Sequence, residues 1–83
     1  MKKSIQTNDW KSFNLELPQF GKAFIVKGKN NNNIYYLFKN LEGKLMIKLH
    51  KYDENNNIIS TNNYSAKFLI IKEWKYFEEY KSN

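Results

Sequence analysis

Aromatic and lysine residues alternate with apolar ones between residues 35 and 52, a pattern suited to binding nucleic acid. Lysine side chains neutralise phosphates, and flat rings offer stacking platforms for unpaired bases. Strand alternation predicts one sheet face that carries Tyr35, Lys39, Lys48, His50 and Tyr52. The same residue types are also ordinary strand formers, and they could instead pack against a second copy of the chain.

Catalysis and metal binding have little support in the sequence. His50 is the only histidine and falls on a predicted strand, where a solvated or stacking role is the commoner one. Asp53 and Glu54 are adjacent in a turn, so their side chains diverge, unlike a paired acid and base. The chain has no cysteine and three widely separated glycines, which argues against a transition-metal site and a phosphate loop. We therefore expect a protein that is not an enzyme and has no cofactor.

The net charge of +6 is concentrated in the middle of the chain. Seven of the 14 lysines lie between Lys22 and Lys51, where Glu42 is the only acidic residue. Such an asymmetry is typical of a protein with a polyanionic partner, although a merely solvated basic surface is the alternative.

The length of 83 residues is that of a single small domain, 1–83, with one modest core. The charged opening of residues 1–4 is not followed by an apolar run, so a secretory signal is not expected. The longest apolar stretch, residues 68–71, is far too short to span a membrane. We expect a cytoplasmic protein without a membrane partner.

The hydrophobic pattern predicts an α+β fold, a curved antiparallel sheet of four to five strands followed by one C-terminal helix. Apolar residues alternate or cluster at strand spacing across the predicted sheet, in the runs 13–17, 24–26, 34–38, 45–52 and 58–69. Turns rich in asparagine separate the later runs, at 30–33, 40–43 and 53–57. The predicted elements are a flexible arm at 1–11, the sheet at 12–69 and the helix at 70–81.

The helix prediction depends on Ile70, Trp74 and Phe77, which recur at helical spacing. No capping residue stands just before Ile70. Rings on two sides of this helix leave apolar surface that one sheet face cannot cover, which predicts a homodimer. The expected dimer interface consists of Trp74, Tyr76, Phe77 and Tyr80.

Alternation also assigns the covered face of the sheet. The residues expected to lie beneath the helix are Ile34, Tyr36, Phe38, Leu45, Ile47 and Leu49. The opposite, open face would carry Tyr35, Leu37, Lys39, Met46, Lys48, His50 and Tyr52.

Residues 34–80 resemble the transcriptional positive cofactor four family of single-stranded DNA-binding proteins, within the wider group that includes the Whirly and purine-rich-element-binding folds. The resemblance lies in the run 38–52, with its Gly43-Lys44 turn and alternating strand, and in 66–69 followed by Trp74 and Phe77. The family's Lys-Pro-Gly turn is replaced here by residues 60–63, and its Asn-Pro helix cap by residues 70–71.

The resemblance implies a sheet with a C-terminal helix, a dimer through the helices and single-stranded nucleic acid on the open face. It carries Lys39, Lys44 and Lys48 over as phosphate partners and Tyr52 as a stacking ring. Tyr35 and His50 are added from the predicted faces alone.

The sequence is therefore compatible with two classes of function. The first is a single-stranded nucleic-acid-binding protein, with DNA favoured over RNA, that supports transcription, replication or recombination. The second is a small phage-type inhibitor or interaction module that docks on a host protein. The net charge favours the first class, and the aromatic residues Tyr76 and Tyr80 suit the second.

Overall fold

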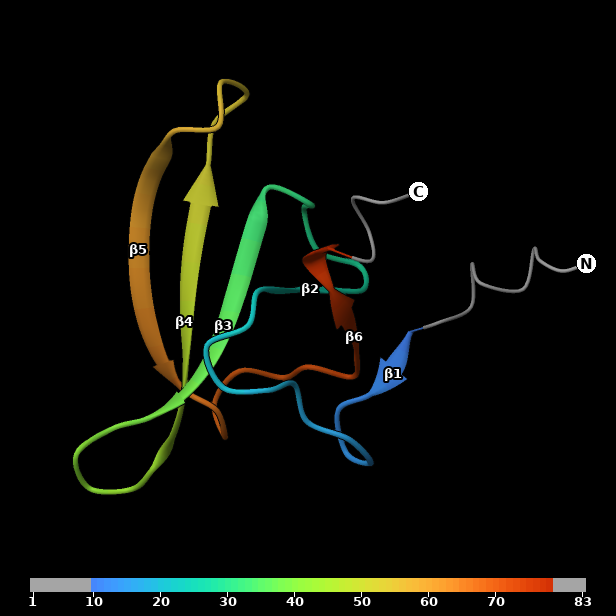
Figure 1. The fold of residues 1–83 in the computed structure, drawn as a ribbon, viewed down its shortest axis with the longest axis vertical. Coiled ribbons are helices and arrows are strands. Elements are labelled where there is room, and N and C mark those ends of the chain that lie inside the picture. The colour runs from blue at the N-terminus through green and yellow to red at the C-terminus, as the bar shows by residue number, and fades with distance from the viewer. Residues whose placement is uncertain (1–9, 79–83) are drawn as a thin grey trace, which may run out of the picture.

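The computed structural model describes residues 10–78, and every named element in this range is a β-strand. The strands are β1 (Lys11–Ser12), β2 (Phe24–Val26), β3 (Asn33–Lys39), β4 (Leu45–Tyr52), β5 (Ile58–Ser65) and β6 (Glu73–Tyr76). They form one antiparallel sheet in the order β1-β6-β2-β3-β4-β5 (Figure 1). The long meander β3–β4–β5 makes one half of the sheet, and the short strands β2, β6 and β1 make the other.

Asparagine and aspartate side chains shape the two turns of the meander. Asn40 Oδ1 accepts hydrogen bonds from the backbone N–H groups of Glu42 and Lys44, both at 2.9 Å, and Gly43 adopts a φ of 81°. In the second turn, Asp53 Oδ1 accepts from Asn55 and Asn57 at 2.8 and 2.9 Å. These local bonds favour tight turns over continued strand, and they confirm the turns predicted at 40–43 and 53–57.

The Asp53 turn gives a pH-dependent prediction. Chiefly because the backbone N–H of Asn57 donates to its carboxylate, the pKa of Asp53 is lowered from its ordinary value of 3.8. A lowered folded-state pKa stabilises the fold above the unfolded value, and that contribution disappears as the pH falls through the folded value. We expect Asp53→Ala to lower Tm at about pH 7, with the deficit shrinking toward about pH 2. Thermal unfolding followed by circular dichroism measures this difference, with Glu54→Ala as the control in the same turn. An equal deficit at both pH values would show that the charged form of Asp53 contributes nothing.

The predicted C-terminal helix is wrong, and with it the α+β class: the described fold is all-β. Residues Glu73–Tyr76 form β6, which is inserted between β1 and β2. Trp74 lies opposite Val26 on one side and Lys11 on the other. The helix prediction rests on three positions, Ile70, Trp74 and Phe77, which are too few to exclude a short strand between them, and the missing helix cap before Ile70 agrees with the strand. Residues 79–81 of the predicted helix lie outside the described residues.

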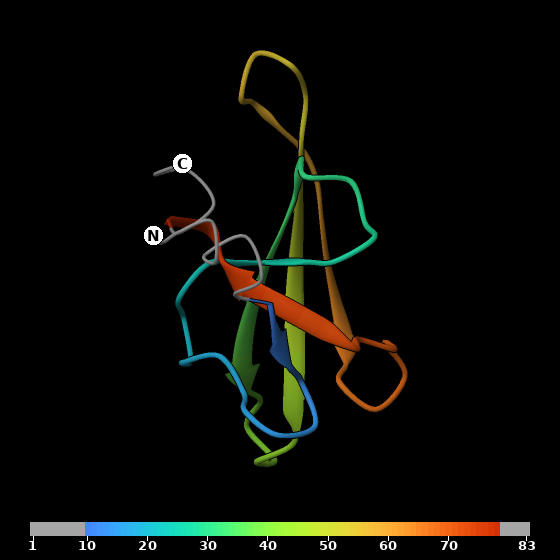
Figure 2. The same cartoon turned by 90° about the vertical axis from the view of Figure 1, so that its right-hand side faces the viewer.

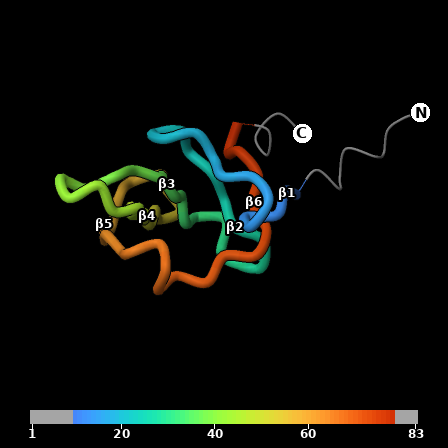
Figure 3. Tube along the Cα trace, turned by 90° about the horizontal axis from the view of Figure 1, so that it is seen from below, coloured from blue at the N-terminus to red at the C-terminus, as the bar shows by residue number. Residues whose placement is uncertain are grey.

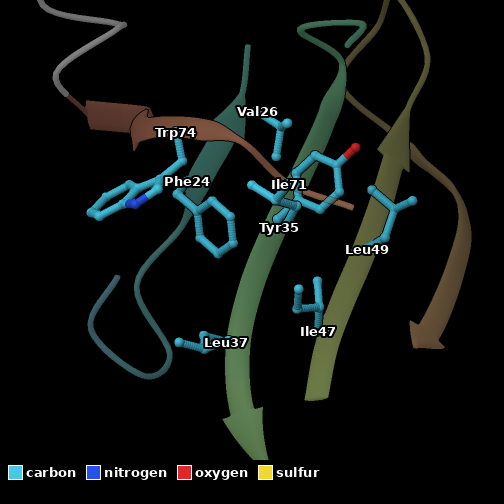
Figure 4. Close-up of a cluster of buried hydrophobic side chains, with 8 residues drawn as sticks. All are labelled: Phe24, Val26, Tyr35, Leu37, Ile47, Leu49, Ile71 and Trp74. Atoms are coloured by element: carbon cyan, nitrogen blue, oxygen red, sulfur yellow. The ribbon is translucent and has the colours of Figure 1, made fainter. Parts of the chain in front are cut away.

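The core lies between the two halves of the bent sheet. Figure 2 shows β6 running obliquely across the long strands of the meander. The buried cluster between these halves consists of Phe24, Val26, Tyr35, Leu37, Ile47, Leu49, Ile71 and Trp74 (Figure 4). Phe24 stacks on Tyr35 with ring centroids 5.7 Å apart and meets Trp74 edge-on at 5.8 Å. The short strands therefore cover the meander in the place where a helix was expected.

The register of β3 against β4 corrects the predicted faces. Tyr35 lies opposite Leu49, and Leu37 lies opposite Ile47. Opposite residues in an antiparallel pair point to the same face, so Tyr35 and Leu37 belong to the core face. A shift of one residue in the pairing of two strands moves every side chain to the other face. The predicted faces of β3 differ from the observed ones by this shift: the residues expected on the covered face lie on the opposite one.

Candidate nucleic-acid interface

The meander face that points away from the core cluster, called the open face from here on, carries aromatic and basic side chains. Its members on β3 and β4 are Ile34, Tyr36, Phe38, Met46, Lys48, His50 and Tyr52. On β5 it continues through Thr61, Asn63 and Ser65, which lie opposite His50, Lys48 and Met46. Ile34 is buried, and the other six residues of β3 and β4 are half-buried, because they lie side by side on the sheet.

Three rings form a row across the middle of the open face. The Tyr36 and His50 rings lie 5.4 Å apart and the His50 and Tyr52 rings 6.3 Å apart, both edge to face. The Nδ1 atom of His50 lies 2.9 Å from Oγ1 of Thr61, which holds the imidazole against β5. The row is therefore positioned by side-chain contacts within the sheet and not by a mobile loop.

The phenol of Tyr36 is half-buried in this row. Burial raises its pKa above the ordinary 10.0, and the charge of Tyr52 and the hydrogen bond to it act in the same direction. The phenol is therefore neutral at physiological pH, and it adds no negative charge to the face.

The charged side chains on the three strands of the meander are all basic. Strands β3, β4 and β5 contain Lys39, Lys48 and Lys51 and no acidic residue. The Lys48 ammonium lies 5.8 Å from the centre of the Phe38 ring, and it has no carboxylate partner within residues 10–78. A cation held over a ring at the end of a row of rings is suited to binding a phosphate beside stacked bases.

Two shallow hollows on the open face meet at Tyr36. One, of about 420 Å³, is lined by tyrosines and asparagine amides: Asn31, Asn32, Ile34, Tyr36, Tyr52, Asn56 and Phe77. The other, of about 390 Å³, lies on the Lys48 side and includes Phe38 and His50. Both volumes are in the range of small-molecule sites, so each hollow has room for a base or a sugar.

The structure brings together three of the six predicted binding residues, Lys48, His50 and Tyr52. Tyr35 is 3% exposed in the core, so its predicted place on the open face is wrong. Lys39 is exposed at the end of β3, opposite Leu45 and so on the core side, where it lies 5.9 Å from the Phe20 ring. Lys44 is exposed in the first turn and pairs with Glu42 at 3.7 Å.

Tyr36 is the candidate site residue that the sequence interpretation placed on the wrong face. The signal that could have found it is the Asn40–Lys44 turn, because a turn of this length sets Lys39 opposite Leu45. Counting back from that pair puts Tyr36 beside Lys48 on the open face.

The structure places two residues of the predicted dimer interface, Trp74 and Tyr76, on the strand β6. Trp74 is fully buried, so it cannot contribute to an exposed contact surface. Tyr76 and Phe77 are half-buried at the end of β6, and Tyr80 lies outside the described residues. The surface expected on a helix is thus replaced by a strand whose largest side chain faces the core.

Comparisons with family models, with curated proteins and with solved structures gave no match to this chain. The sheet-then-helix plan implied by the resemblance is not the observed fold, and the arguments below use only the geometry. Among residues 10–78, no helix is long and apolar enough to cross a membrane. The same residues contain no cluster of three or more potential metal-ligating side chains.

Proposed function

We propose that the open face binds single-stranded nucleic acid. The observation that carries this proposal is the row of Tyr36, His50 and Tyr52 beside Lys48, on three strands without an acidic residue. Stacking on aromatic side chains tolerates every base, and a neighbouring cation tracks the phosphate backbone.

The hollows support a mode of binding in which a base enters beside Tyr36. The amides of Asn31, Asn32 and Asn56 at the rim of one hollow offer both donors and acceptors to a base edge. Lys48, at the other hollow, would then hold the adjoining phosphate. A duplex has no free base faces for the rings, so it is expected to bind more weakly than a single strand.

The test is the fluorescence anisotropy of a labelled oligothymidine, titrated with the protein at several salt concentrations. We expect binding at low salt, a steep loss of affinity as salt rises and poor competition by a duplex of the same length. An absence of binding at low salt would contradict the proposal. It would favour the alternative class, a module whose partner is a protein.

A lysine pair on one strand tests the location of the phosphate contact. Lys48 and Lys51 both belong to β4, but the three-residue spacing puts them on opposite faces. Lys48→Ala is expected to weaken oligothymidine binding and to reduce the slope of log K against log salt by about 0.7. Lys51→Ala is the matched control and should leave the slope nearly unchanged. Equal losses for the two variants would indicate diffuse attraction to a basic protein and not a site on the open face.

A further inference from the structure

The outer edge of β5 is a long strand edge without charge or proline, and its register irregularity lies at its start, between Ile58 and Ser60. β5 ends the sheet order, and no described strand pairs with its outer edge, as Figure 1 and the view from below (Figure 3) show. Its eight residues, Ile58–Ser65, include no charge and no proline, although charged residues make up 27% of the chain. Natural edge strands are commonly shielded by lysine, proline or bulges, because unpaired backbone groups recruit further strands.

The hydrogen-bond pattern identifies which backbone groups of β5 face outward. The N–H of Ala66 donates to the carbonyl of Leu45 on β4 at 3.0 Å. Because the direction of these groups alternates along a strand, Tyr64 and Asn62 also bond toward β4. The backbone groups of Thr61, Asn63 and Ser65 therefore point away from the sheet. The register irregularity opposite Lys51 and Tyr52 leaves Ser60–Ser65 as the regular part of this edge.

We propose that β5 pairs antiparallel with β5 of a second copy of this chain, about a two-fold axis at Asn63. In this register Thr61 of each copy lies opposite Ser65 of the other, and Asn63 lies opposite its own equivalent. The outward backbone N–H and C=O groups of all three residues then have hydrogen-bond partners on the other copy. The interface is isologous, as two-fold symmetry requires. The inference is independent of the proposed function, since it rests on the outward backbone groups of the β5 edge, whereas only the side chains of Thr61, Asn63 and Ser65 belong to the open face.

Two observations favour a second copy over a different peptide. The edge is neutral, so two copies of a chain of net charge +6 can meet there without placing lysines opposite one another, and a charged peptide gains no ion pair. Exposed apolar side chains also flank both ends of the strand. Ile58 and Ile59 are 52% and 63% exposed at its start, and Phe68 is 76% exposed just past its end. Antiparallel pairing brings the start of β5 in one copy beside the end of β5 in the other. The exposed isoleucines of one copy would then be covered by Phe68 of the other.

The test is the mass of the full chain in solution, measured by sedimentation equilibrium up to high micromolar concentration without nucleic acid. The wild type is expected to form a dimer of twice 10.0 kDa. Asn63→Pro is expected to raise the dimer dissociation constant more than about tenfold. It removes the outward backbone N–H of residue 63 from each copy and places a proline ring in the interface. The N–H that it removes is not used by β4, so the fold should persist, as circular dichroism can verify. A monomeric wild type, or an Asn63→Pro variant that dimerises as tightly, would overturn the proposal.

A charge-exchange pair tests the register without altering the backbone. Asn63→Lys is expected to be monomeric, because two like charges would face each other across the axis. Mixing it with Asn63→Glu should produce a heterodimer, since opposite charges then meet. A mixture that stays monomeric would overturn the two-fold at Asn63. Asn62→Ser is the control that should leave the wild-type dimer intact, because its backbone groups bond toward β4.

Discussion

Replacing Trp74 by alanine is expected to lower the free energy of unfolding by about 3–5 kcal/mol. The indole is fully buried between the two halves of the sheet, edge-on to Phe24 at 5.8 Å and to Tyr76 at 4.8 Å. Its Nε1–H donates to the carbonyl of Glu16 at 2.8 Å, which ties the 13–23 segment to β6. A small domain has a total stability of about 5–15 kcal/mol, so much of the chain would be unfolded at physiological temperature.

Urea unfolding at one fixed protein concentration measures this loss, because self-association would otherwise shift the apparent stability. Trp74→Phe is the matched variant: it keeps a ring against Phe24, loses the Nε1 bond and should be less destabilised. If Trp74→Ala lost less than about 1 kcal/mol, the two halves of the sheet would not share the described core.

The largest expected effect on binding is that of Tyr36→Ala. Loss of a stacking ring costs about 1–3 kcal/mol per base, or roughly 5- to 150-fold in the affinity for oligothymidine. The salt slope should stay nearly constant, because stacking releases no counterions. The two measurements together separate a ring contact from the phosphate contact expected at Lys48.

Two tyrosine variants complete this experiment. Tyr36→Phe keeps the ring and removes only the hydrogen bond to Tyr52, so most of the affinity should remain. Tyr64→Ala removes a ring from the opposite face of β5, where Tyr64 lies opposite Ile47, and it should leave binding unchanged. If Tyr64→Ala and Tyr36→Ala weakened binding equally, the open face would not be the binding surface.

The meander and its turns could be predicted from local sequence. Asn40 and Asp53 accept hydrogen bonds from backbone groups two and four residues ahead, so each turn is determined by residues adjacent in the chain. The alternation in β4 is equally local, and it placed Lys48, His50 and Tyr52 on one face correctly.

The remaining errors concern contacts between distant segments. Whether residues 73–76 form a helix or a strand depends on β1 and β2, which offer hydrogen bonds on both sides of Trp74. Tertiary pairing of this kind overrides the weak helical spacing of a short segment. The face of Tyr36 depends on the register of β3 against β4, and alternation within β3 alone cannot supply that register.

The central claim, that the open face binds single-stranded nucleic acid, is tested most directly by NMR of the nitrogen-15-labelled full chain. Adding oligothymidine at low salt is predicted to cause the largest amide shift changes around Tyr36, Lys48, His50 and Tyr52. Amides of β1 and β6, on the other half of the sheet, should change little. Shift changes centred on β6, or no shift changes at all, would contradict the assignment of this face.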